Sequence, residues 1–156
     1  ALNNALQGKL ADAGTDLGRL LINSTIGIFG LFDVASELGL EKHDEDFGQT
    51  LAVWGWDNSN FLFWPLLGPR TVRDTGGWVV DAYTDPTWYT LNKSVAARNS
   101  LVALRFVDVR AALLPTDKVV EEAALDKYAY VRDAYLQRRR NLIFDGRPPR
   151  LEDVMD

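Results

Sequence analysis

Residues 47–67 read FGQTLAVWGWDNSNFLFWPLL, and this stretch decides the predicted fold. Its first arm, 47–56, is mostly apolar and leads into Asp57-Asn58-Ser59-Asn60, four residues that each favour turns. The second arm, 61–67, is apolar on every side and contains Pro65, which kinks or breaks a helix. A helix without a polar face must be enclosed by protein or face lipid. The stretch therefore predicts a helical hairpin with one arm in a core or in a membrane.

The rest of the chain predicts an all-α fold. Apolar residues recur at three- and four-residue spacing, whereas the period-2 alternation typical of strands never persists. The expected helices run from Thr15 or Asp16 to Asn23, from Leu31 to Leu38, from Pro69 to Tyr83, from Lys93 to Leu114, and from Thr116 or Asp117 to near Gly146. Pro115 is expected to separate the last two, because proline lacks the N–H that a helix interior needs.

The composition fits one globular domain. With 156 residues, 47% hydrophobic and 25% charged, the chain is long enough to bury a core, and we expect residues 1–156 to form a single domain. The net charge of -5 argues against a nucleic-acid binder, and the lack of cysteine excludes disulfides and thiol chemistry. The longest uncharged run, Leu20 to Phe32, has 13 residues, fewer than the roughly 20 that span a bilayer. Five Trp, five Tyr and seven Phe nevertheless favour a membrane interface.

Residues with catalytic potential are few. His43 is the only histidine, and its neighbours Asp44, Glu45 and Asp46 invite a metal or acid/base site. Consecutive residues point in different directions, so a solvated link between helices is the better interpretation. No nucleophile elbow or phosphate-binding loop is present, and Asp46-Phe47-Gly48 lacks the other motifs of a kinase. We expect no enzyme, no metal and no cofactor, and a small hydrolase centred on His43 ranks last among the alternatives.

Glycine and arginine pairs offer two further hypotheses. Gly14 with Gly18, and Gly76 with Gly77, favour tight helix contacts, because a glycine inside a helix otherwise costs about 1 kcal/mol relative to alanine. Arg70 and Arg73 follow the apolar run and suit either lipid phosphates or the solvation of a helix end. For the triple arginine at 138–140, solvation and salt bridges are the favoured interpretation.

Three separated blocks of sequence carry a resemblance to a known family. They are LINSTIGIFGLFDVA at 21–35, HDEDFGQTL at 43–51, and PLLGP at 65–69 followed by Val72-Arg73-Asp74. In this order and spacing the chain is similar to the MlaA/VacJ family of outer-membrane lipoproteins, and the tyrosine-rich segment 128–138 continues the similarity. The match covers nearly the whole chain.

The resemblance implies a fold and a role in lipid transport. The fold would be a ring-like, monotopic helical domain in the periplasmic leaflet of the outer membrane of a Gram-negative bacterium. The function would be passive: phospholipid leaves the outer leaflet through an amphipathic channel, which maintains the lipid asymmetry of that membrane. The implied partners are phospholipid, an outer-membrane porin trimer and the periplasmic lipid carrier MlaC. The lipid-anchored N-terminal portion of the family is expected to be missing from residues 1–156.

The resemblance also places the hairpin in the channel wall. The lipid-channel candidates are Phe47, Gly48, Leu51, Val53, Trp54, Gly55, Phe61, Leu62, Phe63, Trp64, Pro65 and Leu67. Arg70 and Arg73 are the candidate head-group contacts. The alternative is a soluble helical protein-interaction module of the cell envelope, in which the aromatic residues form an ordinary core.

Overall fold

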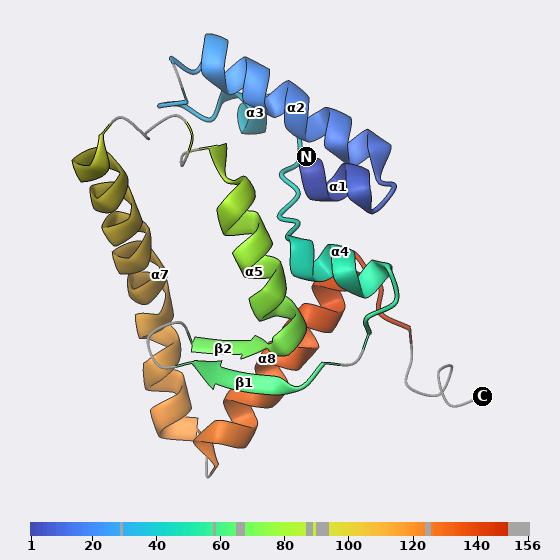
Figure 1. The fold of residues 1–156 in the computed structure, drawn as a ribbon, viewed down its shortest axis with the longest axis vertical. Helices are drawn as coiled ribbons and strands as arrows, with labels where there is room; N and C mark the ends of the chain where they lie inside the picture. Colours follow the sequence, from blue (N-terminus) through green and yellow to red (C-terminus); the bar gives the residue numbers. More distant parts are fainter. Residues whose placement is uncertain are drawn as a thin grey trace. The chain divides into compact units, whose positions relative to one another are not determined.

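The computed structural model in Figure 1 is mostly helical, with a small antiparallel sheet. It describes residues 1–28, 30–57, 59–64, 68–86, 89, 94–123 and 126–149, with only the backbone for 112–123. In chain order the elements are α1 (Leu2–Leu6), α2 (Leu10–Thr25), α3 (Val34–Glu37), α4 (Phe47–Val53), β1 (Phe61–Trp64), β2 (Gly68–Thr71), α5 (Val72–Thr84), α7 (Val95–Ala123) and α8 (Lys127–Ile143). The predicted all-α class is therefore right for most of the chain and wrong at β1 and β2.

The chain divides into two compact units. The first consists of Ala1–Ser59 and Arg73–Trp78, and the second of Asn60–Val72 and Val79–Asp156. α5 contributes residues to both units. The single domain expected from the sequence stays a prediction.

The first unit is built around α2. α1 packs against α2 and α4, and α3 packs against α2, as Figure 1 shows for the blue and cyan part of the chain. The predicted start of α2 at Thr15 or Asp16 is wrong, because the helix begins at Leu10, just after a turn in which Gly8 takes φ +81. The predicted end of a helix at Leu38 is confirmed, because Leu38 is the C-cap of α3 and Gly39 follows it with φ +77.

The predicted helical hairpin is right in its first arm and wrong in its second. Asp46 caps α4 by accepting a hydrogen bond of 2.9 Å from the backbone N–H of Gln49. Phe61–Trp64 is a strand instead, paired antiparallel with Gly68–Thr71 so that Phe61 lies opposite Thr71. Periodicity alone cannot separate a short apolar strand from a buried helix, and aromatic residues favour the strand.

The second unit packs β2 against α8 and α7 against α8. Phe61 of β1 makes edge-to-face contacts with Tyr128 and Tyr135 of α8, with ring centroids 5.7 Å and 6.0 Å apart. Tyr128 and Tyr135 belong to the tyrosine-rich segment 128–138, which lies in the last helix expected from the sequence. The strand thus finds its packing partner more than sixty residues further along the chain.

Two predicted boundaries near Pro115 are wrong. The backbone of α7 stays helical from Val95 to Ala123 and so passes through Pro115. A proline in a helix removes one hydrogen bond and bends the axis, but neighbouring turns can keep the helix continuous. The last helix begins at Lys127 rather than after Thr116 or Asp117, since Asp126 caps it by accepting from the N–H of Ala129 at 3.0 Å.

Candidate functional site: a polar interior beneath an apolar surface

The described residues bury polar side chains and expose apolar ones. The buried apolar residues are Ala13, Ala35 and Ala52. The buried polar and charged residues are Asn4, Arg19, Gln49, Thr50, Thr71, Arg73, Asp74 and Arg139. Water-soluble domains show the opposite distribution, because burying apolar area drives their folding and burying charge opposes it. An apolar exterior over a polar interior is the distribution that suits a protein surrounded by lipid.

α2 has this inverted pattern along its whole length. Its polar residues Asp12, Asp16, Arg19 and Asn23 recur at helical spacing on one face. All four hydrogen-bond or pair with other parts of the first unit. On the opposite face, Leu10, Leu17 and Leu21 are 73%, 53% and 66% exposed. The polar face of α2 was not predicted from the sequence, although the helical spacing of its four polar residues indicates it.

The middle of α2 is fixed by a buried arginine. Arg19 is only 7% exposed, and its Nη2 donates to both carboxylate oxygens of Asp33 at 3.0 Å. Its Nη1 donates to the backbone oxygen of Leu40. Asn23 donates to Asp33 at 2.8 Å and accepts from the N–H of Ala35 at 2.9 Å. These bonds hold the loop after α2 and the short helix α3 against the polar face of α2.

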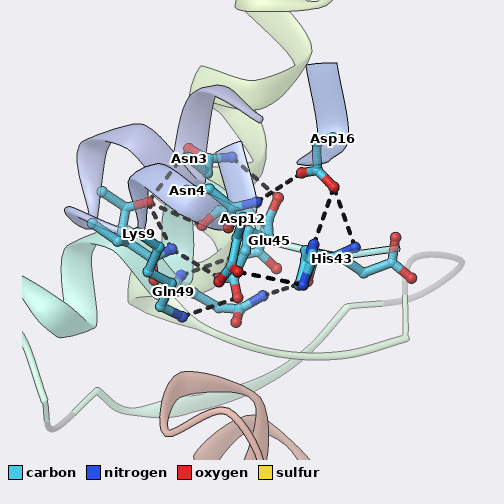
Figure 2. Close-up of polar contacts among 12 residues, drawn as sticks. Asn3, Asn4, Lys9, Asp12, Asp16, His43, Glu45 and Gln49 are labelled. Carbon is cyan, nitrogen blue, oxygen red and sulfur yellow. Dashed lines mark hydrogen bonds and ion pairs between the residues drawn. The ribbon is translucent and has the colours of Figure 1, made fainter. Parts of the chain in front are cut away.

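The first half of α2 meets the link before α4 through His43 (Figure 2). His43 Nδ1 lies 3.2 Å from Asp16, and Nε2 lies 3.6 Å from Asp12. Asn4 Nδ2 donates to the other Asp16 oxygen at 2.7 Å. Burial raises the pKa of Asp16, but hydrogen bonds from the Ala1 amino group and from His43 outweigh burial and lower it. The interpretation of residues 43–46 as a solvated link is therefore wrong at His43.

Glu45 anchors a second group of polar contacts in the same region (Figure 2). Lys9 Nζ pairs with Glu45 at 3.2 Å, and Gln7 Nε2 donates to the same carboxylate at 2.8 Å. Gln7 also reaches the hydroxyl of Thr50, which is completely buried in α4. No cluster of three or more His, Cys, Asp or Glu suited to a metal occurs within the described ranges. The network is therefore an internal scaffold that ties α1 and α2 to α4.

The hairpin candidates of the first unit divide between interior and surface. Gly48 is buried, while Phe47 and Leu51 are half-buried. Val53 and Trp54 are 45% and 57% exposed. The Trp54 ring packs edge-to-face on Phe47 at 5.9 Å and donates from Nε1 to the backbone oxygen of Leu6 at 3.1 Å. Gly55 follows with φ +107, a conformation that favours glycine.

The candidates of the second unit are mostly exposed. Leu62, Phe63 and Trp64 on β1 are 36%, 56% and 41% exposed, whereas Phe61 is half-buried against α8. Pro65 and Leu67 lie outside the described residues. β1 therefore presents an aromatic surface that this unit does not cover. Whether these residues line a lipid channel stays a prediction.

The two candidate head-group arginines occupy different environments. Arg73 is 3% exposed, and its Nε and Nη2 both donate to Asp74 at 3.1 Å. Its Nη1 donates to the backbone oxygens of Trp56 and Asp57, also at 3.1 Å. The guanidinium is thus engaged within the first unit, which does not favour a head-group contact. Arg70 is half-buried on β2 in the second unit.

One of the predicted tight glycine contacts is confirmed. A Cβ on Gly77 would lie 2.3 Å from the backbone N of Gly48, so α5 and α4 touch backbone to backbone. The prediction is wrong for Gly14, Gly18 and Gly76, where no neighbouring atom of the described residues lies within 4 Å of the added atom. Gly77 and Gly48 both belong to the first unit.

Acid should weaken the contacts of Asp33. Hydrogen bonds from Ser36 and Asn23, together with Arg19, hold the pKa of Asp33 well below its ordinary value. A lowered folded-state pKa stabilises the protein above the unfolded value of about 4, and this stability is lost as the pH falls below it. We expect Asp33→Asn to lower the melting temperature at pH 7, with a deficit that shrinks below about pH 4.

The matched control for Asp33 is Asp44→Asn. The side chains of Asp44 and its partner Lys42 are 76% and 66% exposed, so their ion pair contributes little. Melting curves of the three proteins between pH 3 and pH 7 check the prediction. A deficit of Asp33→Asn that stays constant over this range would contradict it.

Comparison with known proteins decides the family. The sequence profile of the MlaA lipoprotein family matches residues 1–142. The chain belongs to this family. This confirms the resemblance carried by the blocks at 21–35, 43–51 and 65–74. Among the described residues, no helix is both long and apolar enough to cross a membrane.

Named relatives agree with the assignment to the MlaA family. The intermembrane phospholipid transport system lipoprotein MlaA of Haemophilus influenzae is 30% identical over 150 residues, or 94% of this chain and 58% of that relative. The lipoprotein of the same name from Escherichia coli is 31% identical over 141 residues, covering 88% of this chain and 54% of that relative. The chain thus spans about half the length of the curated relatives it matches.

A solved structure resembles the fold. It is described as the structural basis for maintenance of bacterial outer membrane lipid asymmetry, and it matches with a TM-score of 0.71 at 27% identity. The match covers 91% of this chain and 71% of that one. The mostly helical architecture predicted from the sequence therefore agrees with a member of known structure.

Proposed function

We propose that this chain is the part of an MlaA lipoprotein that lies in the outer membrane of a Gram-negative bacterium and passes phospholipid out of its outer leaflet. The observation that carries the proposal is the inverted pattern of α2, with its leucines exposed and its charged residues inside. Exposed leucine is costly in water and favourable in hydrocarbon. Relatives named for intermembrane phospholipid transport support the same conclusion.

The apolar surface continues into the loop after α2. Ile26, Ile28, Leu31 and Phe32 are 65%, 55%, 77% and 61% exposed. They add to the exposed apolar residues Leu10, Leu17 and Leu21 of α2 in the first unit. We propose that this unit lies in the periplasmic leaflet, as membership of the family implies.

The transport step would need no catalysis. A lipid that moves along a protein keeps its head group among polar residues and its acyl chains among apolar ones. The hairpin candidates would supply the apolar part: Val53 at the end of α4 and Trp54 next to it in the first unit, and Phe63 and Trp64 on β1 in the second. The porin trimer and the carrier MlaC are proposed as partners through membership of the family.

The soluble-module alternative makes a different prediction about the surface. In a soluble module the exposed leucines and aromatics would be covered by a protein partner. The isolated chain would then carry no lipid and would need no detergent. The exposed face of α2 argues for lipid, since burial of apolar residues within the first unit is limited to alanines among the residues described.

The test is lipid retention by the detergent-purified chain. We expect wild-type protein to retain phospholipid in native mass spectrometry, and a Phe63→Asp, Trp64→Asp variant to retain less, because two carboxylates on β1 disfavour acyl chains. The control is Asn99→Asp, Ser100→Asp, which adds the same charge at two exposed polar positions of α7 in the same unit. Circular dichroism checks that helicity is unchanged.

Two outcomes would count against the proposal. If wild-type protein carries no phospholipid and stays monodisperse without detergent, the soluble module takes its place. If both double variants lose lipid equally, the added charge acts through the surface as a whole and β1 has no special part in the lipid path.

A further inference from the structure

The three arginines near the end of α8 have three different environments. Arg139 is 8% exposed and therefore buried within the second unit. Arg140 donates from Nη2 to the backbone oxygen of Pro149 at 2.7 Å, which ties the returning tail to the helix. Arg138 is exposed, and it has no hydrogen-bond or ion-pair partner in the part of the chain that the structure describes. The sequence treats these residues as one basic cluster, but among the three only Arg138 is both exposed and without a partner in the described residues, while Arg140 also lines the cleft described next.

Arg138 borders a cleft between α8 and the tail that follows it. The cleft has a volume of about 590 Å³ and lies wholly within the second unit. Gln137, Arg138 and Asn141 share one face of α8 and supply amide and guanidinium donors. Ala134 on the same face, with Pro148 and Pro149 of the tail, supplies apolar walls. The cleft is therefore amphipathic, with its hydrogen-bond donors gathered on the helix.

A tight turn after α8 holds the tail, residues 147–149, where its two prolines form a wall of the cleft. Asp145 and Gly146 both take positive φ, +50 and +78. The N–H of Gly146 donates to the oxygen of Asn141 at 2.8 Å, and the N–H of Phe144 donates to the oxygen of Arg140 at 3.2 Å. These bonds satisfy carbonyls at the C-terminal end of the helix, where unpaired oxygens would repel an anion.

The sequence of α8 and of the tail beside the cleft carries more cations than anions, although the chain as a whole is acidic. Residues 127–149 contain six Lys or Arg and two Asp, whereas the whole chain has a net charge of -5. One of the two acids, Asp133, already pairs with Arg132 at 2.8 Å. The other, Asp145, has an interaction within the protein and lies in the turn. The surplus of cations favours an anionic ligand.

We propose that this cleft binds a phosphoryl group, held by the guanidinium of Arg138 and the side-chain amides of Gln137 and Asn141. An arginine offers paired donors that match phosphate oxygens, and amide N–H groups add further hydrogen bonds. The apolar walls leave room for the uncharged part of a phosphate ester. The source is a lipid head group or free phosphate. No described residue of the hairpin lines the cleft, and the proposal does not depend on whether the chain transports lipid.

The test is a calorimetric titration of the whole chain in nonionic detergent with two probes. One is inorganic phosphate and the other is dihexanoyl-phosphatidylglycerol below its micelle concentration, with acetate at equal ionic strength as the reference anion. We expect Arg138→Gln to weaken phosphoryl binding about three- to tenfold. The control is Arg132→Gln, which removes the same charge from the same helix outside the cleft and should leave binding unchanged.

The results of the titration identify the ligand or overturn the proposal. Binding of both probes shows that the phosphoryl group is sufficient, and binding of the lipid probe alone assigns the source to a head group. Binding of inorganic phosphate alone assigns the site to free phosphate. Equal weakening by Arg138→Gln and Arg132→Gln, acetate binding as strong as phosphate, or no binding by the wild type would overturn the proposal. Lipid retention by the Phe63→Asp, Trp64→Asp variant tests transport separately.

Discussion

Replacing Gly77 by alanine is expected to destabilise the first unit by about 3 kcal/mol or to prevent its folding. The new Cβ would lie 2.3 Å from the backbone N and 2.7 Å from the Cα of Gly48. Both neighbours are backbone atoms inside a helix, so they cannot move aside as a flexible side chain would. Relief requires α4 and α5 to separate, which would open the buried contacts around Gly48 and Thr50.

The adjacent glycine provides a matched control for Gly77→Ala. Gly76 lies in the same helix, and a Cβ there would meet nothing within 4 Å. Alanine favours a helix over glycine by about 1 kcal/mol, so Gly76→Ala should leave stability unchanged or raise it. Denaturant unfolding of both variants in detergent, followed by circular dichroism, measures the difference. Equal stability of the two would show that the contact between α4 and α5 does not persist in solution.

Most helical segments were predictable from the sequence because apolar spacing is local, although α1, the start of α2 and the boundary between α7 and α8 were not predicted correctly. Gly39 ends the segment of α3, and Asp46 stands where a cap for α4 is required. Local sequence signals do not predict the secondary structure of a segment where a tertiary contact determines it. Phe61–Trp64 would suit a helix as well as a strand, and it is a strand because Gly68–Thr71 pairs with it and α8 packs on the pair. A pairing partner cannot be seen in a run of four apolar residues.

Which face of each helix points into the protein was harder to predict than where each helix lies in the sequence. The sequence places Val102, Phe106 and Val109 on one face of α7, which in a soluble protein would be the buried face. They are 48%, 43% and 53% exposed, but Arg105 and Asp108 on another face are exposed too, so of these two helices only α2 has an inverted pattern. Periodicity shows that a helix has two faces but does not show which face meets the protein and which meets the surrounding solvent.

The candidate site was found through resemblance more than through chemistry. The hairpin residues lack reactive groups, so no motif separates Trp54 or Phe63 from ordinary core residues. The polar contacts of Asp16, His43 and Glu45 join segments that are distant in sequence. Adjacent charges at 43–46 suggest a solvated link until the fold brings α2 beside them. The sequence could therefore indicate a family but could not assemble this interior.

Replacing Arg73 by alanine is expected to cost about 3–5 kcal/mol, because it leaves the buried Asp74 carboxylate without its main cation. The side chains of Arg73 and Asp74 are 3% and 4% exposed, and the pair is 3.1 Å apart. The same guanidinium also satisfies the backbone oxygens of Trp56 and Asp57. Loss of these three partners at one buried site should release the segment after α4 from the start of α5.

An exposed arginine–aspartate pair serves as the control for Arg73→Ala, because it shows what such an ion pair contributes to stability without burial. Arg132 and Asp133 are also adjacent in sequence and lie 2.8 Å apart, but their side chains are 42% and 65% exposed. Solvent screens such a pair, so Arg132→Ala should cost less than about 1 kcal/mol. Urea unfolding of both variants, with lipid retention measured on the same samples, decides what Arg73 does. If Arg73→Ala keeps its stability and loses only lipid, Arg73 contacts a head group after all; if it loses stability, its buried bonds to Asp74 and the Trp56 and Asp57 carbonyls are what the fold requires.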